Sequence, residues 1–114
     1  MHVVIFEVFP AEGRKDDYFD HVAQLKQDLA ETEGFISVER FQSLTDPDKL
    51  LSLSFWESEA AIARWRNRPR HRKSQAAGRA GIFANYRLRV AEVQRDYGLN
   101  EREQVPEDSR EKNG

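Results

Sequence analysis

Four separate segments of the chain carry the alternating or continuous apolar pattern of β-strands. Residues 2–9 are rich in β-branched and aromatic side chains and end at Pro10. Residues 35–43 and 48–56 have the same character, and the TDPD sequence between them favours a turn, so they predict a hairpin. Residues 82–94 alternate over a longer stretch and predict the last strand.

Two other stretches show the spacing of helices. Between about residue 15 and residue 33, apolar side chains share one helical face, at Tyr18, Val22, Leu25 and Leu29. Gly34 follows, where a left-handed residue ends many helices. Ser58 predicts the N-cap of a second helix, which Pro69 interrupts and which continues from about residue 70 to residue 77.

The order of these elements, β-α-β-β-α-β, predicts an α+β fold of the ferredoxin-like kind. In this fold an antiparallel four-stranded sheet carries both helices on one face. With 114 residues, the chain has the usual size of one domain, which we place at residues 1–98. Residues 99–114 form a polar tail with few apolar side chains, and we expect this tail to be disordered.

Strand alternation predicts which side chains face the helices. That face is expected to carry the apolar residues Leu51, Leu53, Phe55, Tyr86, Leu88, Val90, Val4, Phe6, Val8, Ile36 and Val38. The opposite face would carry Val3, Ile5, Phe9, Phe35, Phe41, Leu50 and Trp56, interspersed with the charged residues Glu7, Glu39, Arg87 and Arg89. An apolar patch of this extent marks an interaction surface, and we expect a homodimer that packs sheet to sheet. A β-bulge that slips the assignment by one residue is the alternative.

The composition excludes several kinds of functional site. The chain has no cysteine, which excludes disulfides, thiolate metal sites and cysteine nucleophiles. No apolar run approaches the roughly 20 residues that span a bilayer, and the N-terminus lacks a signal-peptide pattern. We therefore expect a cytoplasmic protein with no membrane partner.

The basic residues Arg64, Arg66, Arg68, Arg70, Arg72 and Lys73 crowd one short stretch. Such a cluster can bind nucleic acid, but three of its arginines recur every four residues, as on a solvated helix face. Trp65 is the one Phe, Tyr or Trp among them, so no series of aromatic residues forms a stacking platform, and the net charge of the chain is −2. We expect no nucleic-acid partner, and instead attraction of a small anionic substrate such as a carboxylated aromatic or a haem propionate.

Residues 55–75, FWESEAAIARWRNRPRHRKSQ, combine a strand that ends in Phe-Trp, an acidic helix start, a helix tryptophan, a short break and a histidine. With the GFISVERF strand and the long last strand, this pattern resembles the antibiotic-biosynthesis-monooxygenase superfamily of dimeric α+β barrels, over residues 2–94. The superfamily includes cofactor-independent oxygenases of polycyclic phenols, haem-degrading monooxygenases, quinol oxygenases and members with no assigned reaction. The resemblance implies their fold and their homodimer.

The resemblance also implies site residues. Trp65 matches the helix tryptophan that lines a cavity between helices and sheet. His71 lies where some cofactor-independent members have a polar aromatic residue near the substrate, so it becomes the candidate proton acceptor. Gln75 stands where the haem-degrading branch has its axial histidine, which disfavours haem, and it is kept as a substrate-binding candidate. Ala61 replaces an asparagine that some oxygenases carry.

Each candidate has a plain structural alternative. Trp65 also fits an ordinary core residue, and His71 fits a solvated surface histidine. Asn85 and Tyr86, near the start of the last strand, are substrate-binding candidates at the cavity mouth, although Tyr86 also fits the core. His2 and His21 fit structural or exposed positions, and no spacing in the chain predicts a metal site.

The resemblance implies a small monooxygenase that oxidises an aromatic or polycyclic compound in a cavity between helices and sheet, without a cofactor. The deprotonated substrate would give an electron to oxygen, while the protein supplies a dry pocket, an aromatic wall at Trp65 and a proton acceptor at His71. One alternative is a non-catalytic dimeric domain that binds a small molecule or responds to stress. The other is a haem-degrading monooxygenase, which requires a histidine that faces the cavity.

Overall fold

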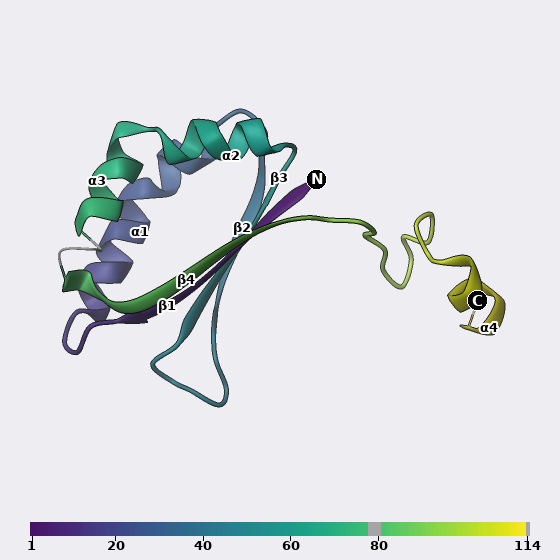
Figure 1. Ribbon diagram of the computed structural model, residues 1–114, viewed down its shortest axis with the longest axis horizontal. Coiled ribbons are helices and arrows are strands. Elements are labelled where there is room, and N and C mark those ends of the chain that lie inside the picture. Colours follow the sequence, from purple (N-terminus) through teal and green to yellow (C-terminus); the bar gives the residue numbers. More distant parts are fainter. Residues whose placement is uncertain (78–80, 114) are drawn as a thin grey trace.

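The computed structural model describes residues 1–77 and 81–113, without the side chains of residues 70, 71, 74, 77 and 113. Its elements, shown in Figure 1, are β1 (His2–Pro10), α1 (Lys15–Ala30), β2 (Phe35–Gln42), β3 (Leu50–Trp56), α2 (Glu59–Arg66), α3 (Pro69–Ala77), β4 (Phe83–Glu92) and α4 (Glu107–Asn113). The predicted order β-α-β-β-α-β is confirmed, and the second predicted helix is split at Pro69 into α2 and α3.

The strands form one antiparallel sheet in the order β2-β3-β1-β4. Residues that pair across strands share a face, and Val4 of β1 lies between Ser54 of β3 and Val90 of β4. Helices α1, α2 and α3 lie together on this side of the sheet (Figure 1). The predicted ferredoxin-like α+β architecture is therefore confirmed.

The helix ends follow local chemistry. The Ser58 hydroxyl accepts a hydrogen bond of 3.1 Å from the backbone N–H of Ala61, which confirms the predicted N-cap of α2. Gly34, after α1, has a φ of 90°, a conformation that side chains disfavour. A Cβ atom on Gly34 would also lie 2.5 Å from that of Ala61, so glycine lets α2 pack directly on this turn.

The buried core consists of two clusters at opposite ends of β3. One contains Val8, Tyr18, Leu50 and Ile82, and the other contains Leu29, Trp56, Ala61 and Ile62. Trp56 is 1% exposed, and its indole N–H donates a hydrogen bond of 2.9 Å to the hydroxyl of Ser54. Between the clusters, β3 presents only the small side chains of Ser52 and Ser54 to the helices.

The predicted faces of β3 are wrong. Leu51, Leu53 and Phe55 lie opposite Glu7, Ile5 and Val3 of β1, on the side away from the helices. Leu50, Ser52, Ser54 and Trp56 face the helices instead, and the two apolar residues of this set are buried. Both alternating sets of β3 contain large apolar residues. A prediction from hydrophobicity alone selects the set with more apolar residues, and that set lies on the outer side.

The start of β2 departs from the prediction for a different reason. The register with β3 shifts between Phe35 and Ser37, as in a β-bulge. As a result Phe35 packs on the helix side against Trp56, with ring centroids 5.3 Å apart, rather than on the outer face. Ile36, which was expected inside, is 47% exposed.

We call the side of the sheet away from the helices the outer face. It carries the apolar residues Val3, Ile5, Phe9, Phe41, Leu51, Leu53 and Phe55, and the charged residues Glu7, Glu39, Arg87 and Arg89. In the part of the chain that the structure describes, no helix covers this face (Figure 1). Glu7 forms salt bridges of 2.7 Å with Lys49 and 2.8 Å with Arg89, and these cations lower the pKa of its carboxyl group.

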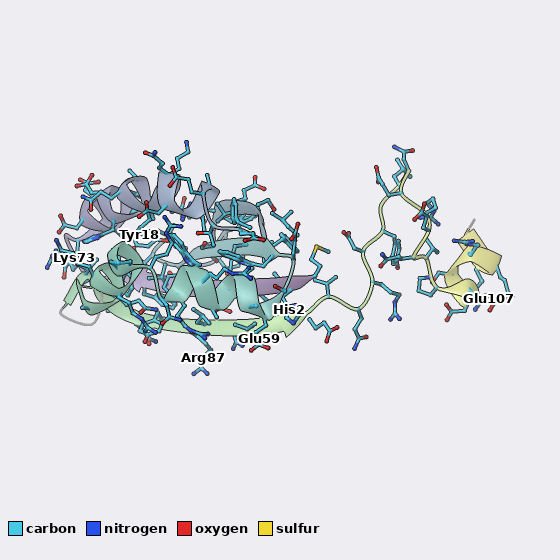
Figure 2. The ribbon with its side chains drawn as sticks, turned by 90° about the horizontal axis from the view of Figure 1, so that it is seen from above. His2, Tyr18, Glu59, Lys73, Arg87 and Glu107 are labelled. Atoms are coloured by element: carbon cyan, nitrogen blue, oxygen red, sulfur yellow. The ribbon has the colours of Figure 1, made fainter. Side chains whose placement is uncertain are left out.

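After β4 the chain leaves the sheet and extends toward α4. Figure 2 shows Glu107, at the start of α4, far from the labelled residues of the sheet and of helices α1–α3. The disorder expected for residues 99–114 stays a prediction, and the structure gives this segment a short helix. Among the described helices, none has the length and apolar character needed to cross a membrane.

Candidate functional site

A cavity of about 360 Å³ lies between the helices and the sheet. Its floor consists of the side chains that the strands direct toward the helices, including Val4, Phe6, Ser52, Ser54 and Leu88. Its walls come from α1, α2 and α3, with the side chains Val22, Leu25, Ile62, Trp65 and Gln75. Small-molecule sites in proteins have volumes of about 300–1,000 Å³, so the cavity is large enough for a compact ligand.

The sequence of β3 explains why the space is open. Ser52 and Ser54 stand at the middle of the floor, between the two core clusters. Leucine or phenylalanine at these positions, as on the outer face, would project into the space between sheet and helices. The hydroxyl of Ser54 accepts the indole N–H of Trp56 and keeps its own O–H as a hydrogen-bond donor.

Trp65 lies where the resemblance places it, among the residues that line the cavity. Its ring is half-buried, and its centroid lies 6.5 Å from that of Trp56. It also packs against the core cluster that contains Leu29 and Ile62. The position suits both a core residue and a cavity wall, and a direct role of Trp65 with a substrate stays a prediction.

Gln75 and Tyr86 also line the cavity. The side-chain oxygen of Gln75 accepts a hydrogen bond of 3.1 Å from Arg72, and the half-exposed ring of Tyr86 contacts Phe6. Asn85 pairs with Phe9 and lies outside the described lining, where its side chain accepts the backbone N–H of Tyr86. Substrate contacts by these residues stay predictions.

His71 lies on α3, and its side chain is outside the described residues. Its expected role as proton acceptor therefore stays a prediction. The structure brings a different histidine to the cavity, because His21 of α1 is half-buried in the lining. The signal was available in the sequence, since His21 follows Tyr18 by one helical turn on the apolar face of α1.

Tyr18 and Arg40 form a polar pair that the sequence reasoning missed. Tyr18 is 5% exposed, and burial raises the pKa of its phenol, while the charge and hydrogen bond of Arg40 act in the opposite direction. Arg40 pairs with Ser52 in the sheet and so shares the cavity side. Arg40 stands two residues after Val38, which was expected to face the helices. Strand alternation therefore predicts the same side for Arg40.

The charge around the cavity has one sign. Its described lining contains Arg40, Arg66 and Arg72 but neither aspartate nor glutamate. Arg72 is also held by the side-chain oxygen of Asn67 at 2.7 Å. Arg68, in contrast, turns toward α1, where Asp28 lies 3.7 Å away. Arg66 and Arg72 of the predicted basic cluster thus line the cavity, and Arg68 connects the segment between α2 and α3 to α1.

The chemistry that this arrangement offers is limited. The walls are mainly apolar and aromatic, although Tyr86, Leu88 and Val90 of the lining are about half exposed to solvent. His21 can accept a proton, and Tyr18 can donate a hydrogen bond. Within residues 1–77 and 81–113, no three His, Cys, Asp or Glu side chains converge as metal ligands. The site suits the binding of an apolar compound and the movement of one proton.

Comparison with known sequences gives the family context. The family model described as antibiotic biosynthesis monooxygenase matches residues 1–77. The protein named jasmonate monooxygenase ABM, from Pyricularia oryzae, is 39% identical over 105 residues, which are 92% of this chain. This chain spans only 49% of the length of that relative. The uncharacterized protein YqjZ of Bacillus subtilis is 31% identical over 82% of this chain and 80% of its own length.

Solved structures agree with the fold. An antibiotic biosynthesis monooxygenase structure from Deinococcus radiodurans superposes with a TM-score of 0.77 at 11% identity, over 87% of this chain and 98% of the other. A mutant of SnoaB from Streptomyces nogalater, described as a cofactor-independent oxygenase, has a TM-score of 0.69 at 15% identity and covers 83% and 95% of the two chains. At such identities the structures share the fold alone. The family match and the P. oryzae and B. subtilis relatives show that this chain belongs to the antibiotic biosynthesis monooxygenase family.

Proposed function

We propose that this protein is a monooxygenase that oxidises an aromatic or polycyclic compound in the cavity between helices and sheet, without a bound cofactor. The observation that carries the proposal is the cavity itself, about 360 Å³ in volume, with mainly apolar and aromatic walls and with basic and hydroxyl side chains among them. Family membership supports an oxygenase, and one relative is named as a monooxygenase of jasmonate. The SnoaB neighbour, described as cofactor-independent, supports the absence of a cofactor by analogy of fold.

The reaction that fits these groups begins with loss of a proton from an acidic C–H bond of the substrate. His21, in the cavity lining, would accept that proton, and Tyr18 would stabilise the resulting oxyanion by a hydrogen bond. The raised pKa of Tyr18 keeps its phenol protonated for this purpose at neutral pH. The carbanion then reduces oxygen. Overall a CH2 group and O2 become a C=O group and water, and the substrate carbon supplies all four electrons.

The assay follows from this stoichiometry. Anthrone, supplied with O2 and a metal chelator, should consume one O2 per molecule and give anthraquinone that contains one atom of labelled oxygen. His21→Ala should lower kcat by about 10²-fold or more, since this is the usual contribution of a general base. His2→Gln is the matched control, because His2 lies on β1 outside the described lining. Equal rates for wild type and His21→Ala would assign the proton transfer elsewhere, and His71→Ala would then be compared.

A second candidate is haem degradation, and the position of His21 favours testing it. His21 could ligate the iron, and Arg66 and Arg72 could pair with the propionates. Haem would supply the iron that activates oxygen against its own ring. A saturable Soret shift that His21→Ala or His71→Ala removes would make this the leading function. Binding of anthrone without oxygen consumption, and no Soret shift, would indicate a non-catalytic binding domain.

We also propose that two copies of this chain associate through the outer face. The face combines seven large apolar side chains with two glutamates and two arginines, which can pair across a two-fold axis. A typical stable interface buries about 800 Å² on each partner. Sedimentation equilibrium should give a mass twice that of the 13.3 kDa chain, and a monomer at micromolar concentration would contradict the proposal.

A further inference from the structure

Arg40 is the charged side chain that the sheet itself directs into the cavity. It lies on the edge strand β2, and its register with Ser52 fixes it to the same side as the cavity floor. The other two lining arginines, Arg66 and Arg72, come from the helices α2 and α3. The register of the sheet sets the side on which Arg40 lies, and its side chain is exposed at the edge of the cavity.

Arg40 has no acidic partner in the described part of the chain. Its described neighbour is the phenol of Tyr18, to which its guanidinium can donate a hydrogen bond. Arg68 shows the contrast, because Asp28 and Glu31 lie 3.7 and 3.8 Å from its guanidinium. A guanidinium presents several donors in a planar fork, and one bond to a phenol leaves most of them available.

The lining as a whole is matched to an anion. Three arginines and His21 border the cavity, and no carboxylate does so among the described residues. Most of the remaining lining is aliphatic or aromatic, including Phe6, Leu25 and Trp65. A ligand that satisfies both properties has an apolar body and one negatively charged end.

We propose that Arg40 binds the carboxylate of the substrate, so that the substrate class is a compact apolar monocarboxylic acid. This inference rests on the proposed function for the existence of a substrate, but it concerns binding alone. A carboxylate accepts two parallel hydrogen bonds from a guanidinium, which fixes its orientation as well as its position. The acid group then lies at the β2 edge of the sheet, and the apolar body extends over Ser52 and Ser54 toward Trp65.

The test compares two probes that differ only in charge: anthracene-9-carboxylic acid and anthracene-9-carboxamide. Their fluorescence is titrated with the protein at pH 7.5. Wild type should bind the acid about 10-fold or more tightly than the amide, because hydrogen bonds to charged groups contribute more than neutral ones. Arg40→Met should weaken binding of the acid by about 10- to 100-fold and change binding of the amide less than about 2-fold. The amide also reports that the variant is folded.

Two further variants complete the design. Arg40→Lys keeps the charge but loses the fork, and it should give an affinity for the acid between those of wild type and Arg40→Met. Arg64→Met is the matched control, since Arg64 belongs to the basic cluster but lies outside the described lining, where it contacts the backbone oxygen of Glu33. It should leave both affinities unchanged.

Each outcome decides the inference. If wild type does not prefer the acid, or if Arg40→Met keeps the preference while Arg66→Met or Arg72→Met loses it, Arg40 is not the carboxylate site. The oxygen assay is independent of this result. A preference lost in Arg40→Met without any oxygen consumption would keep the anion site and reject the oxygenase. Oxidation of anthrone without a preference for the acid would do the reverse.

Discussion

The helix side and the outer face of the sheet come from the same four strands, yet they differ in the side chains that they carry. On β3 the helix side carries serine at two adjacent inward positions, while the outer face carries leucine and phenylalanine. The inward serines leave a cavity, and the outward apolar residues form a surface that no described helix covers. The centre of β3 therefore reverses the usual contrast between an apolar inside and a polar outside, while the rest of the cavity lining stays mainly apolar.

The largest effect should come from comparing neighbouring aromatic residues on the two sides. Trp56→Ala removes a side chain that is 1% exposed, and it should lower the free energy of unfolding by about 3–5 kcal/mol. Phe55→Ala, one residue away on the outer face, should cost less at low protein concentration. Urea unfolding at several protein concentrations measures both, and equal losses at low concentration would show that the two faces are packed alike.

A charge on the outer face should act on association before it acts on folding. Leu53→Lys places two like charges near each other across a two-fold interface, and it should weaken dimerisation by about 100-fold or more. Sedimentation velocity gives the dissociation constant, and circular dichroism checks the fold. Unchanged dimerisation would place the interface elsewhere on the molecule.

The cavity floor offers the opposite test. Ser52→Leu should fill part of the space and weaken binding of anthracene-9-carboxamide by about 10-fold or more, because added side-chain volume must displace the ligand or the helices. Leu51→Ser, the adjacent change on the outer face, should leave that binding unchanged. Loss of binding in both variants would mean that the floor and the outer face are not independent.

The smallest effects should appear at the two ends of the pH range. The lowered pKa of Glu7 means that its stabilising effect is present above its ordinary value of 4.5 and is lost as the pH falls through the lowered pKa. Tyr18 has a raised pKa, so stability falls as the pH rises above its ordinary value of 10.0. Melting temperatures across pH should lose a small part of the acid dependence in Glu7→Gln and part of the alkaline dependence in Tyr18→Phe.

The sequence predicts the elements of the fold better than it predicts the site. Hydrophobic period and capping residues are local signals, so the order of elements, the N-cap at Ser58 and the break at Pro69 were predicted correctly. The faces of β3 were not, because LLSLSFW has large apolar residues at both alternating sets. Only the position of Trp56 under α2, which depends on the assembled fold, decides between them.

The cavity required information from distant parts of the chain. Tyr18 and Arg40 come from α1 and β2 and meet only because the sheet folds under the helix. Trp65, Gln75 and Tyr86 were named from a family resemblance and lie in the lining, although their roles stay predictions. Arg40 is a single charge on a strand outside the dense basic cluster, and only its register with Ser52 reveals that it lies on the cavity side.

The division of the core into two clusters affects how the protein holds together. Tyr18 and Leu29, at the two ends of α1, belong to different clusters, as do Leu50 and Trp56 of β3. Ser52 and Ser54 are the inward side chains of β3 between these clusters, and the cavity lies above them. A ligand bound in this cavity would contact side chains of both clusters. Such a ligand would raise the free energy of unfolding of the whole domain, since binding to the folded state stabilises that state by mass action.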